Sequence, residues 1–234
     1  MLAGDLDRCI AFPCTDVRHV GHTRPDLPVR RDTIRVIMIS AAPPTDAAII
    51  KLGYREPIDR GETIQAFRSA GFDVGSIEDL RRLGVYVTTA VKCPKLGFGL
   101  KQETVERCSH LLEAELDLFP NVKSILLMGN TAIRAINAIA ERKFGAPVIP
   151  HGSAYKVKGR EYPYGDISLF PSYPESGRNL SVEGNRQDVI AVDIRNAIEV
   201  AGGPATRPHR TRPLRERRHS PAPPPYVSPA GSSE

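Results

Sequence analysis

The chain has 234 residues, 41% of them hydrophobic, and a formal net charge of +5 at pH 7. This length can bury one substantial core, and no apolar run approaches the roughly 20 residues that a membrane-spanning helix needs. Charged residues at positions 5, 7 and 8 interrupt the opening segment, which therefore does not resemble an export signal. We expect a soluble, cytoplasmic monomer with no membrane partner.

The charge is unevenly distributed along the chain. Residues 203–234 contain six arginines, two glutamates and eight of the 21 prolines, and the rest of the chain is nearly neutral. Such a segment cannot bury enough apolar surface to fold. We therefore expect one domain over residues 1–201 and a disordered, basic, Pro/Arg-rich tail over 202–234. The tail could bind phosphate backbones without sequence preference, or could be a solvated segment with no partner.

Predicted strands alternate with amphipathic helices. In chain order we expect a strand at 35–40, helices at 63–70 and 77–83, a strand at 85–91, a helix at 104–119, a strand at 124–129, a helix at 131–143, a strand at 167–170 and a helix at 185–200. Residues 147–158 and 161–164 have the pattern of a small hairpin or an extended connection. Alternation of this kind is typical of an α/β fold with a mainly parallel, four-stranded sheet and helices on both faces.

In such a sheet, ligands bind at the carboxyl ends of the strands. Here those ends are residues 40–44, 89–93, 129–131 and 171–179, and most of them carry small or polar residues. Tight turns of this composition suit the close approach of a flat ring or a phosphate, although they are also common in ordinary loops.

Four cysteines occur as two pairs, Cys9/Cys14 and Cys93/Cys108. Disulfides are rare in a reducing cytosol, so paired thiols are better interpreted as metal ligands. The spacings lack the tight C-x2-C knuckles of a zinc ribbon, whereas an iron–sulfur cluster accepts more scattered thiolates. Zinc stays an alternative, and so do ordinary core cysteines.

Together, these segments and cysteines resemble the iron–sulfur branch, families 4 and 5, of the uracil-DNA glycosylase superfamily. The first-strand motif of that branch, G-E-A-P-G or G-L-A-P-A, corresponds to Ser-Ala-Ala-Pro-Pro at residues 40–44, and Y-I-T-N-V-V-K-C corresponds to residues 86–93. A strand followed by an L-G-x-x-A turn corresponds to residues 126–132, and S-Y-H-P-S followed by Asn corresponds to 172–176 and Asn179. The resemblance covers about residues 9–200.

The resemblance implies a three-layer α/β/α sandwich that acts on DNA in base-excision repair. The implied reaction is hydrolysis of the N-glycosidic bond of a deaminated base, uracil or a related one. It also implies a structural 4Fe–4S cluster on Cys9, Cys14, Cys93 and Cys108. The first pair is usually C-x2-C in the family and is Cys9-x4-Cys14 here, so the cluster geometry should differ.

Three positions that carry chemistry in the family differ in this chain. The first-motif glutamate is replaced by Ala41, the base-reading asparagine by Thr89, and the last-motif histidine by Pro174, or by Phe170 in a second alignment. Losing one such group typically costs about 10²–10⁴ in rate. Asp46 is the nearest candidate to position water, although it could equally be a helix N-cap.

The candidate site residues follow from these motifs. As catalytic candidates we name Asp46 and Thr89, and for the base pocket and DNA contacts Ser40, Ala41, Pro43, Tyr54, Ser172, Tyr173, Ser176, Arg178 and Asn179. Tyr54 or Tyr173 could stack on a flipped base, or could simply pack. We expect a weak glycosylase or one of altered specificity. The alternatives are a catalytically impaired DNA-binding protein of the same fold and an unrelated zinc-bound α/β protein.

Overall fold

A five-stranded sheet with strand order β2-β1-β3-β5-β4 forms the centre of the fold. The computed structural model of this chain describes residues 9, 13–19, 29–43, 60–97, 99–152, 154–174 and 184–203. Within them the strands are β1 (Val36–Ser40), β2 (Val85–Thr89), β3 (Ser124–Met128), β4 (Tyr162–Tyr164) and β5 (Ile167–Ser172). All neighbouring strands run parallel except β4, which is antiparallel to β5.

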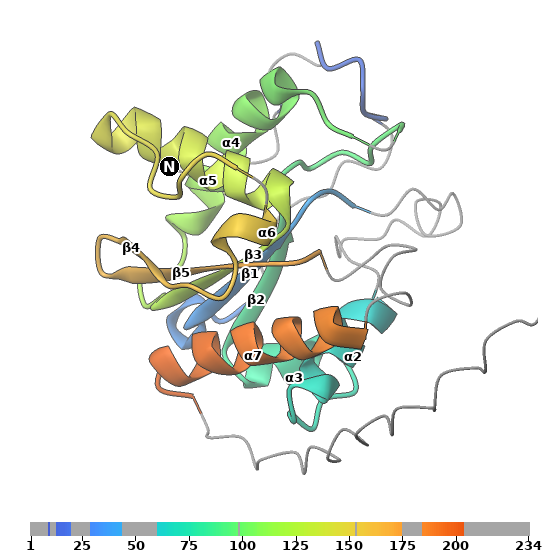
Figure 1. Cartoon of the computed structure of the whole chain (residues 1–234), viewed down its shortest axis with the longest axis vertical. Helices are drawn as coiled ribbons and strands as arrows, with labels where there is room; N and C mark the ends of the chain where they lie inside the picture. Colours follow the sequence, from blue (N-terminus) through green and yellow to red (C-terminus); the bar gives the residue numbers. More distant parts are fainter. Residues whose placement is uncertain are drawn as a thin grey trace, which may run out of the picture.

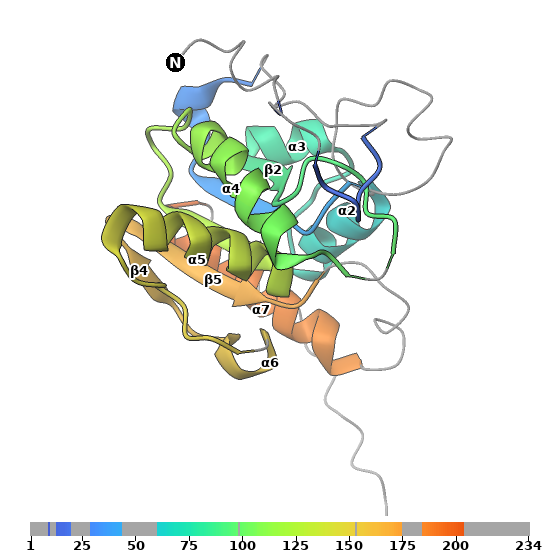
Figure 2. The same cartoon turned by 90° about the horizontal axis from the view of Figure 1, so that it is seen from above.

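Helices cover both faces of the sheet. They are α2 (Arg60–Ser69), α3 (Ile77–Arg82), α4 (Gln102–Leu116), α5 (Asn130–Phe144), the short α6 (Ala154–Val157) and α7 (Gly184–Val200), with a 3₁₀ turn η2 at Arg31–Thr33. Figure 1 shows α4 and α5 on one side of the sheet and α2, α3 and α7 on the other, and Figure 2 shows α4, α5 and α6 from above. The expected three-layer α/β/α architecture is therefore confirmed.

The three neighbouring strands β1, β2 and β3 are buried at every position. This is why their sequences read as continuous apolar runs rather than as an alternation. One core lies between the sheet and α4 and α5 and contains Ile37 and Leu127. The other lies under α2, α3 and α7 and contains Met38 and Leu126.

The elements match the expected ones closely, except in the segments that we interpreted as a hairpin or an extended connection, where residues 154–157 form the short helix α6. The sheet has a fifth strand, β4, which arises from the segment that we interpreted as a hairpin or an extended connection. Its sequence Tyr-Pro-Tyr shows no alternation, and Pro163 cannot donate to a ladder, so the segment suits only an edge position. β5 also extends beyond Phe170 to Ser172, which places the last motif at the end of a strand.

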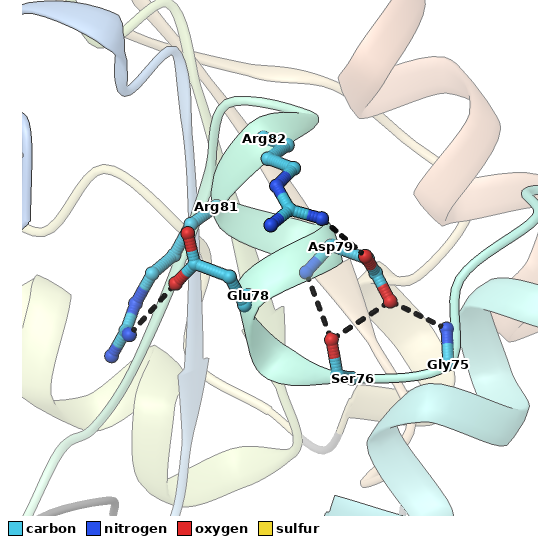
Figure 3. Close-up of polar contacts among 6 residues, drawn as sticks. All are labelled: Gly75, Ser76, Glu78, Asp79, Arg81 and Arg82. Carbon is cyan, nitrogen blue, oxygen red and sulfur yellow. Dashed lines mark hydrogen bonds and ion pairs between the residues drawn. The ribbon is translucent and has the colours of Figure 1, made fainter.

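A capped helix sets the position of β2. The Ser76 hydroxyl accepts a hydrogen bond from the Asp79 N–H (3.2 Å), and Asp79 Oδ2 accepts one from the Gly75 N–H (3.0 Å), so Ser76 and Asp79 cap the start of α3 (Figure 3). Gly84 then leads into β2 with a φ of 81°, and a Cβ there would lie 3.1 Å from the Thr33 carbonyl oxygen. Only glycine suits this close, left-handed turn, which places β2 beside β1.

None of the helices in the described ranges combines the length and apolarity that spanning a lipid bilayer would require.

Candidate functional site at the carboxyl edge of the sheet

Three polar side chains lie at the carboxyl ends of strands. Ser40 of β1 is the register partner of Thr89 of β2, and Ser172 of β5 is the partner of Met128. Side chains two residues apart share a face of a strand. Because Met38, Val87 and Phe170 belong to the core under α2, α3 and α7, these three polar residues face the same side.

This polar row is buried, and parts of it lack hydrogen bonds. Thr89 and Ser172 have no exposed surface, and neither Thr89 Oγ1 nor Ser172 Oγ has a hydrogen-bond partner among the described residues. The same holds for Thr63 Oγ1 on α2 and Asp193 Oδ2 on α7. Unsatisfied buried polar atoms cost free energy, so such a group at a strand edge indicates a site for water or a ligand.

Asp193 is a buried carboxyl group beside the end of β5. Burial raises its pKa, the hydroxyl of Ser172 and the charge of Lys158 offset part of this effect, and the resulting pKa is about 6. The Ser172 hydroxyl thus affects the pKa of the Asp193 carboxyl group. The geometry between the two side chains nevertheless does not meet the criteria for a hydrogen bond. Sequence reasoning missed Asp193, although its place between Val189 and Ala197 on the apolar side of the helix was a signal.

Tyr173 follows β5 directly and is 4% exposed. Lys158 Nζ lies 3.9 Å from the centre of its ring, and the guanidinium carbon of Arg186 lies 5.2 Å away. These cations contact the ring. Their positions and the burial of the ring favour packing over stacking on a flipped base for Tyr173.

The described parts of the four predicted turns contact one another in two pairs at this edge. The N–H groups of Ala90 and Val91 donate to the carbonyl oxygens of Ser40 (2.8 Å) and Ala41 (3.0 Å), which joins the turn after β2 to the turn after β1. Pro43, in the latter turn, is buried. A Cβ on Gly129 would lie 3.3 Å from Pro174, so the turn after β3 packs closely against the segment after β5.

The cysteine-containing segments are joined by Asp16. Its carboxylate accepts hydrogen bonds from the Lys101 N–H and the Thr104 hydroxyl, each 2.6 Å long, at the start of α4. Its carbonyl oxygen accepts from the Leu96 N–H (2.9 Å), and the Arg18 N–H donates to the Pro94 carbonyl oxygen (2.7 Å). These contacts pair the segment after Cys14 with the segment after Cys93, next to the helix that carries Cys108.

The two buried cysteines feel the charges of the other thiols. Burial, first, and the charges of Cys108, Cys9 and Cys14 together raise the pKa of Cys93 to about 12. Burial also raises the pKa of Cys108, against a backbone hydrogen bond from Lys92 and the charge of that lysine. Cys9 and Cys14 thus act on both Cys93 and Cys108.

The cysteines suit a metal in number and type. Four thiolates are the donor set of a 4Fe–4S cluster or of a structural zinc ion, and a bound cation would reverse the pKa effects described above. Among the described residues, no group of three Cys, His, Asp or Glu side chains that could hold a metal ion is found. The fit to a metal therefore lies in the donor chemistry of the four cysteines.

Several predicted residues lie outside the described ranges. These are Asp46, Tyr54, Ser176, Arg178 and Asn179, together with the tail from residue 204 onward.

Comparison with known proteins agrees with this arrangement. The model of the Uracil DNA glycosylase superfamily matches residues 33–193, which run from the segment before β1 to Asp193. A type-5 uracil-DNA glycosylase of Thermus thermophilus is 28% identical over 125 residues, which cover 53% of this chain and 54% of the relative. The match thus spans about half the length of that curated relative. The interpretation as an unrelated α/β protein is therefore wrong.

Proposed function

Because the chain belongs to the uracil DNA glycosylase superfamily, we propose that it is a DNA glycosylase of base-excision repair from the iron–sulfur branch that includes families 4 and 5. The similarity to a type-5 uracil-DNA glycosylase supports this branch. The four cysteines also support it, because that branch holds a cluster on four cysteines and because Cys9, Cys14 and Cys108 act electrostatically on Cys93.

The observation that carries the proposal is the buried polar row at the carboxyl edge. A glycosylase turns a nucleotide out of the duplex and holds its base by hydrogen bonds in a closed pocket. The Thr89 hydroxyl is buried and has no partner among the described residues, so it is available to donate to and accept from a base. We assign the base site to this edge.

Catalysis in this site should be weak or directed at an altered base. A threonine hydroxyl donates and accepts through a single oxygen, whereas an asparagine amide offers a separate donor and acceptor that match a pyrimidine edge. Ala41 and Pro174 supply neither a carboxylate nor an imidazole. We assign the positioning of water to Asp46.

The cysteine site has a structural role in this proposal. Cys9, Cys14, Cys93 and Cys108 would hold a 4Fe–4S cluster, with zinc as the alternative, and the bound metal would fasten the N-terminal segment to β2 and α4. Metal sites that exist only in the native state contribute their binding free energy to folding.

DNA is the proposed partner, and the basic tail should add to its affinity. Each phosphate contact releases counterions and makes binding dependent on salt. Removing the residues after Gly203 should weaken binding and flatten the plot of log affinity against log salt concentration. An identical slope for both proteins would show that the tail does not touch DNA.

The experiment that tests the proposed function is a panel of oligonucleotides. Single- and double-stranded substrates carry uracil, hypoxanthine or xanthine, and alkali cleaves the strand wherever a base has been excised. We expect slow excision of at least one base, and a drop of about 10²-fold in Asp46→Ala with nearly unchanged DNA affinity. Asp188→Ala, at an exposed position of α7, is the matched control.

A second function is favoured by one observation, the loss of all three usual side chains at residues 41, 89 and 174. The protein would then bind a damaged or flipped base without cleaving it. Tight, lesion-dependent binding with no excision of any base in the panel would establish this alternative.

A further inference from the structure

A buried ion pair lies behind the carboxyl end of β2. The side chains of Lys92 and Glu115 are 4% and 2% exposed, and Lys92 Nζ donates to Glu115 Oε2. The other carboxylate oxygen, Oε1, accepts hydrogen bonds from the Tyr86 hydroxyl (2.7 Å) and the Thr88 hydroxyl (2.9 Å). The carboxylate is therefore satisfied on both oxygens.

Lys92 also forms hydrogen bonds to the turn that contains Thr89. Its ammonium donates to the Thr88 hydroxyl oxygen (2.9 Å) and to the Thr89 carbonyl oxygen (2.6 Å), so with Glu115 each of its three protons has an acceptor. The turn is held from the other side as well, because the Ala90 and Val91 N–H groups bond to the turn after β1. The backbone at Thr89 is thus fixed from two directions.

The same pair adjoins two of the cysteines. Cys93 follows Lys92 in the chain, and the Lys92 backbone hydrogen-bonds to the Cys108 thiol. Cys108 and Glu115 both belong to α4. The pair therefore connects the cysteine-bearing helix to the strand that ends in Thr89.

Stability alone is a weak reason for such a pair. Two charges lose their hydration when they are buried, and replacing a buried ion pair by apolar side chains of similar volume is often neutral or stabilising. What apolar side chains cannot supply is the directed hydrogen bond to the Thr89 carbonyl oxygen.

We propose that Lys92 and Glu115 are a positioning pair that holds the Thr89 turn in place at the base site and ties it to Cys93 and Cys108. The role assigned to the base site rests on the proposed function. The positioning of the turn itself does not.

The test compares single and double substitutions in the full-length, metal-loaded protein. Lys92→Met and Glu115→Met alone leave one uncompensated buried charge and should be much less stable. The double variant Lys92→Met/Glu115→Met removes both charges and should recover most of the stability, yet it lacks the hydrogen bond to Thr89. Lys143→Met is the control, because it removes the partly exposed ion pairs of α5 Lys143 with Glu113, which lies on α4 like Glu115, and with Asp117.

The primary measurement is hydrogen–deuterium exchange, by mass spectrometry, of a peptide that contains Ala90 and Val91. We expect exchange at least tenfold faster in the double variant, bound iron released several-fold faster to a chelator, and no change in peptides from α5 or in the control. Excision of the preferred base should slow through kcat more than through KM. Glu115→Gln, which keeps an acceptor oxygen, should give an intermediate exchange rate.

A double variant of normal stability with unchanged exchange, iron release and base excision would overturn the proposal, because the pair would then be purely structural. If the double variant does not fold, Glu115→Gln decides: exchange at the wild-type rate contradicts the proposal, and faster exchange supports it. Exchange and iron release need no glycosylase activity. An inactive wild-type protein would therefore refute the proposed function while this test still stands.

Discussion

Two buried carboxylates flank the carboxyl edge of the sheet, and their surroundings are opposite. Behind β2, Glu115 has a lysine partner and two hydroxyl donors. Beside β5, Asp193 is influenced only by the Ser172 hydroxyl and the charge of Lys158, its Oδ2 has no hydrogen-bond partner among the described residues, and its pKa is raised to about 6. One end of the edge is thus fully satisfied and fixed, whereas the other retains polar groups without partners.

The contrast shows how one edge of a sheet can contain both side chains with a fixed geometry and side chains that are available to a ligand. Satisfied buried networks fix a local geometry, and unsatisfied or perturbed groups concentrate where a protein binds or transforms a ligand. Thr89 combines both conditions. Its backbone carbonyl oxygen is hydrogen-bonded to Lys92, while its side-chain hydroxyl lacks a partner among the described residues. This is the arrangement expected of a contact residue on a rigid support.

The largest effect should follow from removing the cysteines that adjoin the ordered end. Cys93→Ser or Cys108→Ser should give colourless, poorly soluble protein, because the metal's binding free energy would be lost from the folded state. Absorbance near 400 nm and iron content measure the loss. Soluble, iron-free protein of unchanged thermal stability would show that the cysteines are ordinary core residues.

Breaking the satisfied pair should have the next largest effect. Glu115→Met leaves Lys92 charged and buried, which should lower the free energy of unfolding by about 3–5 kcal/mol. Urea denaturation at pH 7.5 measures it. A loss below about 1 kcal/mol, no larger than that expected for the half-exposed Glu113, would remove the distinction between the two ends of the edge.

Removing the charge of the buried carboxylate at the unsatisfied end, Asp193, should stabilise the protein at high pH rather than destabilise it. Because the pKa of Asp193 is higher in the folded state than its ordinary value of 3.8, the folded state binds this proton more tightly. The resulting stability is fully present below about pH 4 and is lost as the pH rises through about 6. We therefore compare the change in the free energy of unfolding that Asp193→Asn causes at two pH values. This change should be about 2–4 kcal/mol more stabilising at pH 8 than at pH 4.

Urea denaturation at the two pH values measures this difference, with Asp188→Asn on the exposed side of α7 as the control. If Asp193→Asn changes the free energy of unfolding equally at pH 4 and pH 8, then the pKa of the Asp193 carboxyl group is not raised in the folded protein.

The smallest effect should come from Ser172→Ala. The Ser172 hydroxyl favours the charged form of Asp193, so its removal should raise the pKa of that carboxyl group further. Carboxyl chemical shifts followed by NMR between pH 4 and pH 9 measure this change. A lower pKa in the variant would indicate that Asp193 has a different partner.

The sequence predicted the elements whose pattern depends on local packing. Strands β1, β2 and β3 are apolar runs because both of their faces are covered, and such runs are readable without any tertiary information. For edge strand β4 the choice between a hairpin and an extended connection stayed open, because Tyr-Pro-Tyr becomes a strand only through its pairing with β5.

The site was harder to predict than the fold. The motif turns and the cysteine pairs could be identified from their order along the chain. The pair of Lys92 and Glu115 joins residues 23 positions apart, and a lysine or a glutamate in isolation predicts a solvated charge. Asp193 likewise resembles any helical aspartate until its burial beside Ser172 is known.

The most direct test of the central claim, that the base site lies at Thr89, is the single-turnover rate of uracil excision in Thr89→Asn and Thr89→Ala. Thr89→Asn restores an amide with a donor and an acceptor for the pyrimidine edge, so we predict at least about tenfold faster excision of uracil. Thr89→Ala should reduce excision of the preferred base by a similar factor. If both variants fold normally and excise every base in the panel at the wild-type rate, the claim is contradicted.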